Sequence, residues 1–425
     1  MSGQCPVMHD FTMMNEDFVN DPYQFCPALQ EQPVHFAPEL NAYLVTRYAD
    51  VEAILPDTEH FSSSNTNAPI HPPGEAALEV LKELDFGFRP NLINADPPRH
   101  TLVRKYVADA ISPKRLRALE PMVREWAEEQ VDKLISEGGG DLFAELAFPL
   151  PGLTGFSLIG FPQEDLAQLK AWCDRRVTFT YGRSSEEEQV RVAQNVGAFW
   201  AYTNEFIRAR MENPVDDFTS EMVRRHFENP EEFTPRDIAA VLFGVSLAAH
   251  ETTTNLIGNG IRRLMENRDQ WDALVADPKL IPNAVEETLR FDTPVIGWRR
   301  RAKEDVEVGG TVIPKDATVL MLFFSANHDP ARFENPDVYD VMRKDARNHV
   351  TFGKGVHFCS GAPLARMEMK VVLELLTTKV PDMRLVPDQD FHFTPNIAMR
   401  GPTRLMVEVG NAPLAAAATA DAASI

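Results

Sequence analysis

The sequence has few cysteines, a deficit of positive charge and no long apolar run. Its 425 residues include four widely spaced cysteines and no C-x-x-C pair, which argues against a disulfide framework and fits a reducing cytoplasm. Lys and Arg number 42 against 63 Asp and Glu, giving a formal net charge of −21. A nucleic-acid-binding protein needs a basic surface, so this charge argues against that class. The longest central apolar run, residues 319–324, is far shorter than the ~20 residues of a membrane span.

The N-terminus lacks the basic segment and apolar run of a signal peptide, so we expect a cytoplasmic protein without a membrane anchor. Long amphipathic patterns outnumber short strand-like ones, which predicts a mainly α fold with minor β. Length alone would suggest two or three domains. We nevertheless expect residues 1–410 to form one large helical domain with small flanking sheets. Residues 411–425 are Ala-rich, and we expect a disordered tail there.

Several helix and strand boundaries can be predicted. Three residues predict a helix start: Thr234 as the N-cap, Pro235 at the first helical position and Asp237 as an acid in the first turn. The helical pattern continues to residue 266. Strands are expected in residues 306–324, and a further helix in residues 362–377.

One cysteine lies in a glycine-rich loop directly before that last helix, in the stretch FGKGVHFCSG at residues 352–361. The unpaired N–H groups and positive dipole of a helix start favour a thiolate at Cys359. A single thiolate suits haem iron better than zinc, which needs three or four ligands. A buried structural cysteine beside a glycine-rich turn is the alternative interpretation.

The long helix carries an unusual central segment. Gly244, Ala248 and Thr252 follow at intervals of four and share one face, which leaves room for a flat partner and a small ligand. Residues 252–254 are three consecutive threonines, which are poor helix formers because β-branching restricts χ1. A locally unfavourable choice at mid-helix indicates a functional site.

Four motifs, found in the order and spacing expected for the family, resemble those of the cytochrome P450 family, the haem-thiolate monooxygenases. The pattern F-x-x-G-x-x-x-C-x-G around Cys359 resembles the haem-ligand loop. Residues 248–253 resemble the oxygen-activation motif, with Ala249 where glycine is usual. The sequence D-P-P-R-H-x-x-x-R resembles a propionate-binding helix, and E-x-x-R at residues 287–290 resembles the family's core ion pair.

The resemblance implies a set of site residues. Cys359 would be the iron ligand of haem b, with Glu251 and Thr252 as the catalytic pair that delivers protons to bound O2. The further cofactor-binding residues would be His100, Arg104, Ala248, Arg300, Phe352, His357 and Gly361. The propionate arginine could be any of residues 299–301. The substrate pocket would include Gly244, Ala248, Val295, Ile296 and Ala398. A structural network would join Glu287, Arg290 and Arg343.

The implied function is insertion of one oxygen atom, by hydroxylation, O-dealkylation or epoxidation, into a small or medium apolar substrate. The chain has no flavin or nicotinamide fingerprint, so electrons from NAD(P)H would arrive only indirectly, through a ferredoxin-type or flavin-containing donor. The basic residues Lys105, Lys114, Arg115 and Arg117 could form its docking face, or simply a solvated helix face. A monomer is expected. The alternatives are the haem domain of a fused self-sufficient monooxygenase and a non-catalytic haem sensor or carrier.

Overall fold

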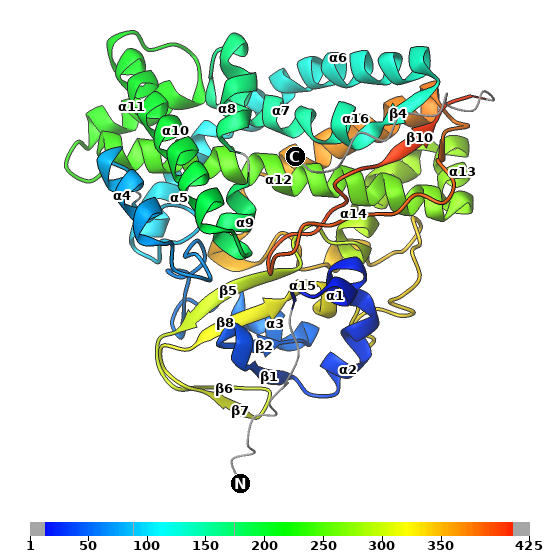
Figure 1. Ribbon diagram of the computed structural model, residues 1–425, viewed down its shortest axis with the longest axis horizontal. Coiled ribbons are helices and arrows are strands. Elements are labelled where there is room, and N and C mark those ends of the chain that lie inside the picture. The colour runs from blue at the N-terminus through cyan, green and yellow to red at the C-terminus, as the bar shows by residue number, and fades with distance from the viewer. Residues whose placement is uncertain (1–12, 88, 174, 411–425) are drawn as a thin grey trace.

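The protein is mainly helical, with small sheets gathered at one end. The computed structural model describes residues 13–87, 89–173 and 175–410, and the predicted tail 411–425 lies outside them. In Figure 1 the long helices fill the upper body, while β1, β2, β5 and β8 lie below them beside the N-terminal helices. The predicted fold class, mainly α with minor β, is confirmed.

The helices have the following bounds in chain order: α1 (Glu16–Asn20), α2 (Cys26–Gln30), α3 (Tyr48–Ile54), α4 (Glu75–Glu83), α5 (Arg99–Ala110), α6 (Pro113–Glu137), α7 (Pro149–Ile159), α8 (Leu166–Trp172), α9 (Arg176–Tyr181), α10 (Glu186–Glu212), α11 (Phe218–Glu228), α12 (Pro235–Glu266), α13 (Arg268–Ala276), α14 (Ile281–Phe291), α15 (Phe323–Ala326) and α16 (Ala362–Lys379).

The strands are short: β1 (Val34–Ala37), β2 (Ala42–Val45), β3 (Phe61–Ser62), β4 (Gly139–Asp141), β5 (Gly297–Ala302), β6 (Val306–Val308), β7 (Thr311–Ile313), β8 (Thr318–Leu322), β9 (Arg384–Leu385) and β10 (Met406–Glu408). The largest sheet has the order β1-β2-β8-β5-β3, in which β2 and β8 are parallel. A second sheet has the order β4-β10-β9, and β6 pairs with β7. The largest sheet places β5 next to the helical body (Figure 1).

Helix α12 starts and ends where the sequence predicts. The Thr234 backbone N–H donates to the Asp237 carboxylate at 2.7 Å, and Pro235 occupies the first helical position. The helix then crosses the molecule between α7 on one side and α14 and α16 on others (Figure 1). Because most of its side chains are buried, tertiary packing stabilises it over this unusual length.

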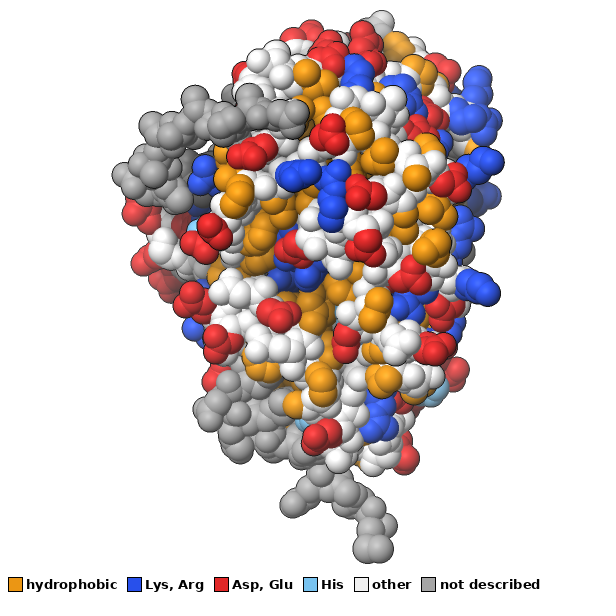
Figure 2. Space-filling view, turned by 90° about the vertical axis from the view of Figure 1, so that its right-hand side faces the viewer, with side chains coloured by type: hydrophobic (Ala, Val, Ile, Leu, Met, Phe, Trp, Pro, Cys, Tyr) orange, Lys and Arg blue, Asp and Glu red, His pale blue; other side chains and the backbone are white. Residues whose placement is uncertain are grey.

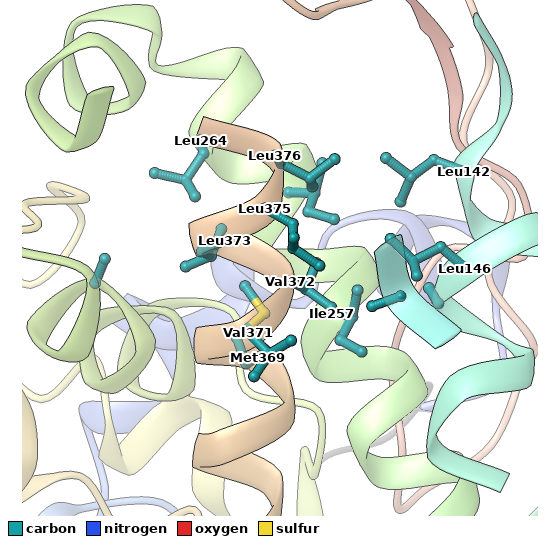
Figure 3. Packing of buried hydrophobic residues seen from close by; sticks show 14 of the residues in the cluster. Leu142, Leu146, Ile257, Leu264, Met369, Val371, Val372, Leu373, Leu375 and Leu376 are labelled. Atoms are coloured by element: carbon teal, nitrogen blue, oxygen red, sulfur yellow. The ribbon is translucent and has the colours of Figure 1, made fainter. Parts of the chain in front are cut away.

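The main core lies where α12, α14 and α16 meet α6. Val372 of α16 and Ile257 of α12 lie side by side in it, close to Leu146 (Figure 3). Burial of apolar side chains, worth about 25 cal/mol per Å², fixes α16 against α12. This packing positions the loop before α16, which carries Cys359, so that it faces the middle of the long helix across a cavity.

Some local structure differs from what the sequence suggests. Pro149 occupies the first position of α7, shortly after a short π-helix (Phe143–Ala147), because proline is compatible with the first helical turn. The predicted strand over residues 317–324 ends at Leu322, and α15 follows. In the face shown in Figure 2, acidic, basic and apolar side chains are interspersed. Among the described residues, no helix is long and apolar enough to cross a membrane.

Candidate active site

A single cavity collects most of the predicted site residues. It lies between α12, α16, β5 and the loop that precedes α16. The predicted residues that line it are Arg104, Gly244, Ala248, Thr252, Val295, Arg300, Phe352, His357, Cys359 and Gly361. Its surface is predominantly apolar, so the basic groups and the thiol stand out as the places where a ligand can be held by polar contacts.

The loop that carries Cys359 is shaped by glycine. Gly353 and Gly355 both have φ of +68°, and a Cβ on Gly355 would lie 2.5 Å from Cα of Pro56. The Cys359 N–H donates to the Phe352 carbonyl at 2.9 Å, which closes the loop and holds the sulfur at the cavity wall.

Burial raises the pKa of the Cys359 thiol, although the N–H groups of Gly361 and Ala362 and the charges of Arg104 and Arg366 act in the opposite direction. The helix start thus favours the thiolate, as expected, while the loss of solvation opposes it, so a thiolate at Cys359 stays a prediction.

Four basic side chains converge on one end of the cavity. Arg104 of α5 and Arg300 of β5 line it, and neither forms an ion pair with any residue in the described ranges. His357 contacts the ring of His100, with 4.1 Å between ring centroids. Both ring nitrogens of the buried His100 lack a hydrogen-bond partner. Burial lowers the pKa of His100 to about 4 and that of His357 to about 3.

The structure distinguishes the three consecutive arginines of β5. Arg300 points into the cavity, as strand alternation requires for a residue two positions from the cavity-lining Trp298. Arg299 turns the other way and donates to the Thr66 carbonyl at 2.9 Å. Arg301 is exposed and pairs with Asp316 at 2.8 Å. Only Arg300 is therefore available to a ligand in the cavity.

The middle of α12 forms the opposite wall. The Thr252 hydroxyl donates to the Ala248 carbonyl at 2.8 Å, which leaves its lone pairs available toward the cavity. Glu251, the next residue back, does not line the cavity, and its side chain is 22% exposed. Of the predicted pair, therefore, only Thr252 lines the cavity.

Sequence reasoning missed the charged groups around Glu251. Lys170 of α8 and Arg176 of α9 both lie close enough to Glu251 for its charge to stabilise their protonated forms. Burial lowers the pKa of Lys170 to about 7, and its Nζ lies 3.4 Å from the centroid of the Phe148 ring. No motif marks these residues, because they come from helices distant in sequence.

His250 is not part of this charged group. Burial lowers the pKa of His250 to about 3, so its 4.0 Å approach to the Glu251 carboxylate is not an ion pair at neutral pH.

The departure from the usual motif at Ala249 has a structural counterpart. A Cβ added to Gly155 of α7 would lie 2.5 Å from Cβ of Ala249. The methyl group that the motif normally lacks is therefore accommodated by a glycine on the neighbouring helix. This contact lets α7 and α12 pack closely.

Two predicted pocket residues do not reach the cavity. Val295 lines it, but Ile296 points in the opposite direction into a separate hydrophobic cluster that also contains Ala398. The Ile296 N–H donates to the Ala398 carbonyl at 2.8 Å, so the pair holds the chain behind the wall. Extended backbone places neighbouring side chains on opposite faces, and the sequence pattern did not reveal which one faces inward.

Glu287, Arg290 and Arg343 form one buried network. The Glu287 carboxylate accepts from Arg290 at 2.8 Å and from Arg343 at 3.1 Å. The two guanidinium groups also donate to backbone carbonyls between residues 327 and 338. These bonds fix the segment that leads towards the Cys359 loop.

The cavity residues fit a haem. A lone thiol lies at the apolar wall and can bind a metal. At one end, Arg104 and Arg300 have no carboxylate partner among the described residues and lie near His100, whose ring nitrogens have no hydrogen-bond partner. This arrangement suits a flat metal complex that carries carboxylates. Among the residues described, no cluster of three or more His, Cys, Asp or Glu could hold a metal ion by itself. The donor set is thus suited to a metal that arrives with most of its ligands already bound.

Comparisons with known proteins identify the family of this chain. Residues 139–379 match the family model for Cytochrome P450. Cytochrome P450 107B1 of Saccharopolyspora erythraea is 32% identical over 96% of this chain and 99% of that protein. The monooxygenase PikC of Streptomyces venezuelae is 34% identical over 93% of each chain.

An intact type IV self-sufficient cytochrome P450 monooxygenase superposes with a TM-score of 0.91 and 36% identity. That match covers 94% of this chain and 52% of the other, so the chain spans about half the length of the fused enzyme. The family uses haem and dioxygen. Motifs, cavity and comparisons lead to one conclusion, that the chain belongs to the cytochrome P450 family of monooxygenases.

Proposed function

We propose that this chain inserts one atom of dioxygen into a small or medium apolar organic substrate, with Cys359 as the iron ligand of a haem b. The observation that carries the proposal is the convergence of Cys359, two unpaired guanidinium groups and Thr252 on a single apolar cavity. When bound, the haem supplies the activation of dioxygen, which no amino-acid side chain can perform.

The cofactor would be held at both its metal and its carboxylates. Arg104 and Arg300 would bind the propionates with charge-assisted hydrogen bonds, with His100 and His357 adding donors at the same end. Phe352, Ala248 and Gly361 line the same space and would contact the ring. These contacts would replace water around the guanidinium groups and fix the orientation of the cofactor.

Thr252 and Glu251 would move protons. The Thr252 hydroxyl would order a water molecule at the cavity wall, since its own proton is used by the Ala248 carbonyl. Glu251, partly exposed and near Lys170, would exchange protons between that water and solvent. Lys170, with a pKa lowered to about 7 by burial, supports a relay that operates near neutral pH.

The substrate would be bound mainly by apolar contacts. Four apolar side chains line the cavity and favour an aliphatic or aromatic substrate: Val241, Val245, Val295 and Trp298.

The electrons would come from NAD(P)H through a separate ferredoxin-type or flavin-containing protein. The similarity to the heme domain of the self-sufficient enzyme supports the alternative that a donor is covalently fused. Donor docking on the predicted basic face is supported by the exposure of Lys105, Lys114 and Arg117, whereas Arg115 pairs with Asp216.

A pair of cysteine variants tests the haem assignment. In Cys359→Ser the spectrum of the reduced carbon monoxide complex should lose the feature of thiolate ligation. Cys173→Ser is the matched control, because Cys173 is buried away from the cavity and should leave the spectrum unchanged. A Cys359→Ser protein with an unaltered thiolate spectrum would refute the assignment.

The reaction itself can be tested with an isotope. The parent protein, supplied with a surrogate ferredoxin and reductase, should transfer one labelled oxygen atom from dioxygen to a compound selected by its spectral shift. If labelled dioxygen gave no labelled product from any compound that shifts the spectrum, the chain would be a haem-binding protein without this activity.

A further inference from the structure

A buried amide occupies the place of a missing side chain on α12. Asn91, in the loop before α5, is 2% exposed, and its Nδ2 donates to the Ala240 carbonyl at 2.8 Å. A Cβ added to Gly244 would lie only 2.8 Å from that same Nδ2. The space at Gly244 is therefore filled by Asn91, and not by a ligand as the spacing of small residues suggested. A glycine inside a helix costs roughly 1 kcal/mol relative to alanine, so the close contact offsets a real local penalty.

The same amide organises the loop that carries it. The Ile93 N–H donates to Oδ1 of Asn91 at 3.1 Å, and the Ala95 N–H donates to the Asn91 carbonyl at 2.9 Å. The side chain thus uses its oxygen to shape the turn and its nitrogen to attach the turn to α12. Substitution of either the amide or the glycine would detach the turn from the helix.

The loop places two apolar side chains against the cavity. Leu92 and Ile93 both line it, as do Asn91 and Gly244. On its other side, the loop is held by His357, whose Nδ1 lies 3.1 Å from the Leu92 carbonyl. The loop is therefore anchored at two points, on α12 and on the segment that carries Cys359, and it spans the space between them.

We infer that the contact between Asn91 and Gly244 sets the clearance between this loop and α12, and so limits the size of ligand that the cavity admits. Asn91 acts as a positioning residue, through Leu92 and Ile93. The inference rests on the proposed function, because it takes the cavity to hold a haem and a substrate. Loss of the contact lets the loop withdraw and favours bulkier ligands.

Two azoles that differ in bulk provide the probe. Imidazole and 1-phenylimidazole both ligate haem iron through a ring nitrogen, and only the second must fit a phenyl group into the cavity. In Asn91→Ala and in Gly244→Ala, the ratio of the two spectral dissociation constants should shift about tenfold in favour of 1-phenylimidazole, the size of effect typical of a small change in pocket fit. The double variant should shift no further, because both changes break one contact.

Two more variants sharpen the test. Asn91→Asp keeps the side-chain volume but lacks the N–H that bonds the Ala240 carbonyl, and it should behave like Asn91→Ala. Ser246→Ala removes a buried hydrogen bond to the Leu242 carbonyl in the same helix, at a position that does not line the cavity. It should leave the azole ratio unchanged.

The outcomes separate this inference from the function on which it rests. If the parent protein bound neither azole, the haem assignment would fail and the clearance role with it. If the parent bound both azoles but the ratio stayed constant in the Asn91 and Gly244 variants, the haem assignment would stand and the clearance role would be refuted. Equal weakening of both azoles, or additive effects in the double variant, would likewise overturn it.

Discussion

A buried carboxyl group on α16 makes a quantitative prediction about stability. Glu368 is 1% exposed, and its Oε2 has no hydrogen-bond partner. Burial raises the pKa of Glu368 from 4.5 to about 8, with only a side-chain hydrogen bond between Glu368 and Thr154 acting against the rise. The side chain is therefore mostly protonated in the folded protein at neutral pH and ionised in the unfolded chain.

The sign and size of the effect follow from that difference. Above pH 4.5 the unfolded chain releases a proton that the folded protein keeps, so the contribution of Glu368 becomes more destabilising as pH rises, until the folded carboxyl also ionises near pH 8. The slope is roughly 1.4 kcal/mol per pH unit. Between about pH 5 and about pH 7.5 the cost therefore grows by about 3 kcal/mol, an upper limit because buried sites relax.

Glu368→Gln should remove this cost. The amide has the same shape and does not ionise, so the free energy of unfolding of the variant, relative to the parent, should increase with pH over that interval. Urea unfolding followed at several pH values measures it. Glu374→Gln is the control on the same helix, because Glu374 is 30% exposed and pairs with Arg124 and Lys370. A Glu368→Gln variant whose relative stability did not change with pH would refute the reasoning.

Three other substitutions test the site and its support. Glu287→Gln should destabilise the fold by about 3–5 kcal/mol and lower the haem content of the purified protein, because it leaves buried arginines without their counter-charge. Gly155→Ala should cost about 1–3 kcal/mol, since the new methyl meets Cβ of Ala249 at 2.5 Å, and Ala249→Gly should restore most of the loss in thermal unfolding. Thr252→Ala should lower the product formed per electron pair by at least about tenfold while leaving substrate binding spectra intact, and unchanged coupling would exclude the proton-delivery role.

The sequence was most informative where local chemistry determines the structure. Helix α12 begins at Pro235 and ends at Glu266 as predicted, because its cap, proline and first-turn acid act within a few residues of one another. It was less informative for β5, whose run of three arginines at residues 299–301 lacks the alternation of a half-buried strand. Arg299 and Arg300 are both buried in that strand. Arg299 donates to the Thr66 carbonyl and Arg300 faces the cavity, and only the tertiary structure supplies these surroundings.

The residues that sequence reasoning missed share a physical reason. Asn91 lies 149 positions before its hydrogen-bond partner Ala240, and its loop has no periodicity to mark it. Lys170 and Arg176 become significant only because the fold brings α8 and α9 close enough to Glu251 for its charge to act on them. Motifs identify groups that act on the cofactor, whereas the groups that set clearance and charge around them are recruited from distant segments.

The small residues of α12 illustrate how much the neighbouring elements decide. Gly244, Ala248 and Ala249 are all small, which by itself indicates open space. Their surroundings in the structure nevertheless differ. Gly244 receives the amide of Asn91, Ala249 meets Gly155 of α7, and Ala248 lines the cavity. The space beside Thr252 is therefore narrower than the sequence pattern implies. A ligand there would approach α12 at Ala248, the residue whose carbonyl holds the Thr252 hydroxyl. This places the binding surface and the proposed proton-delivery group on the same helical turn.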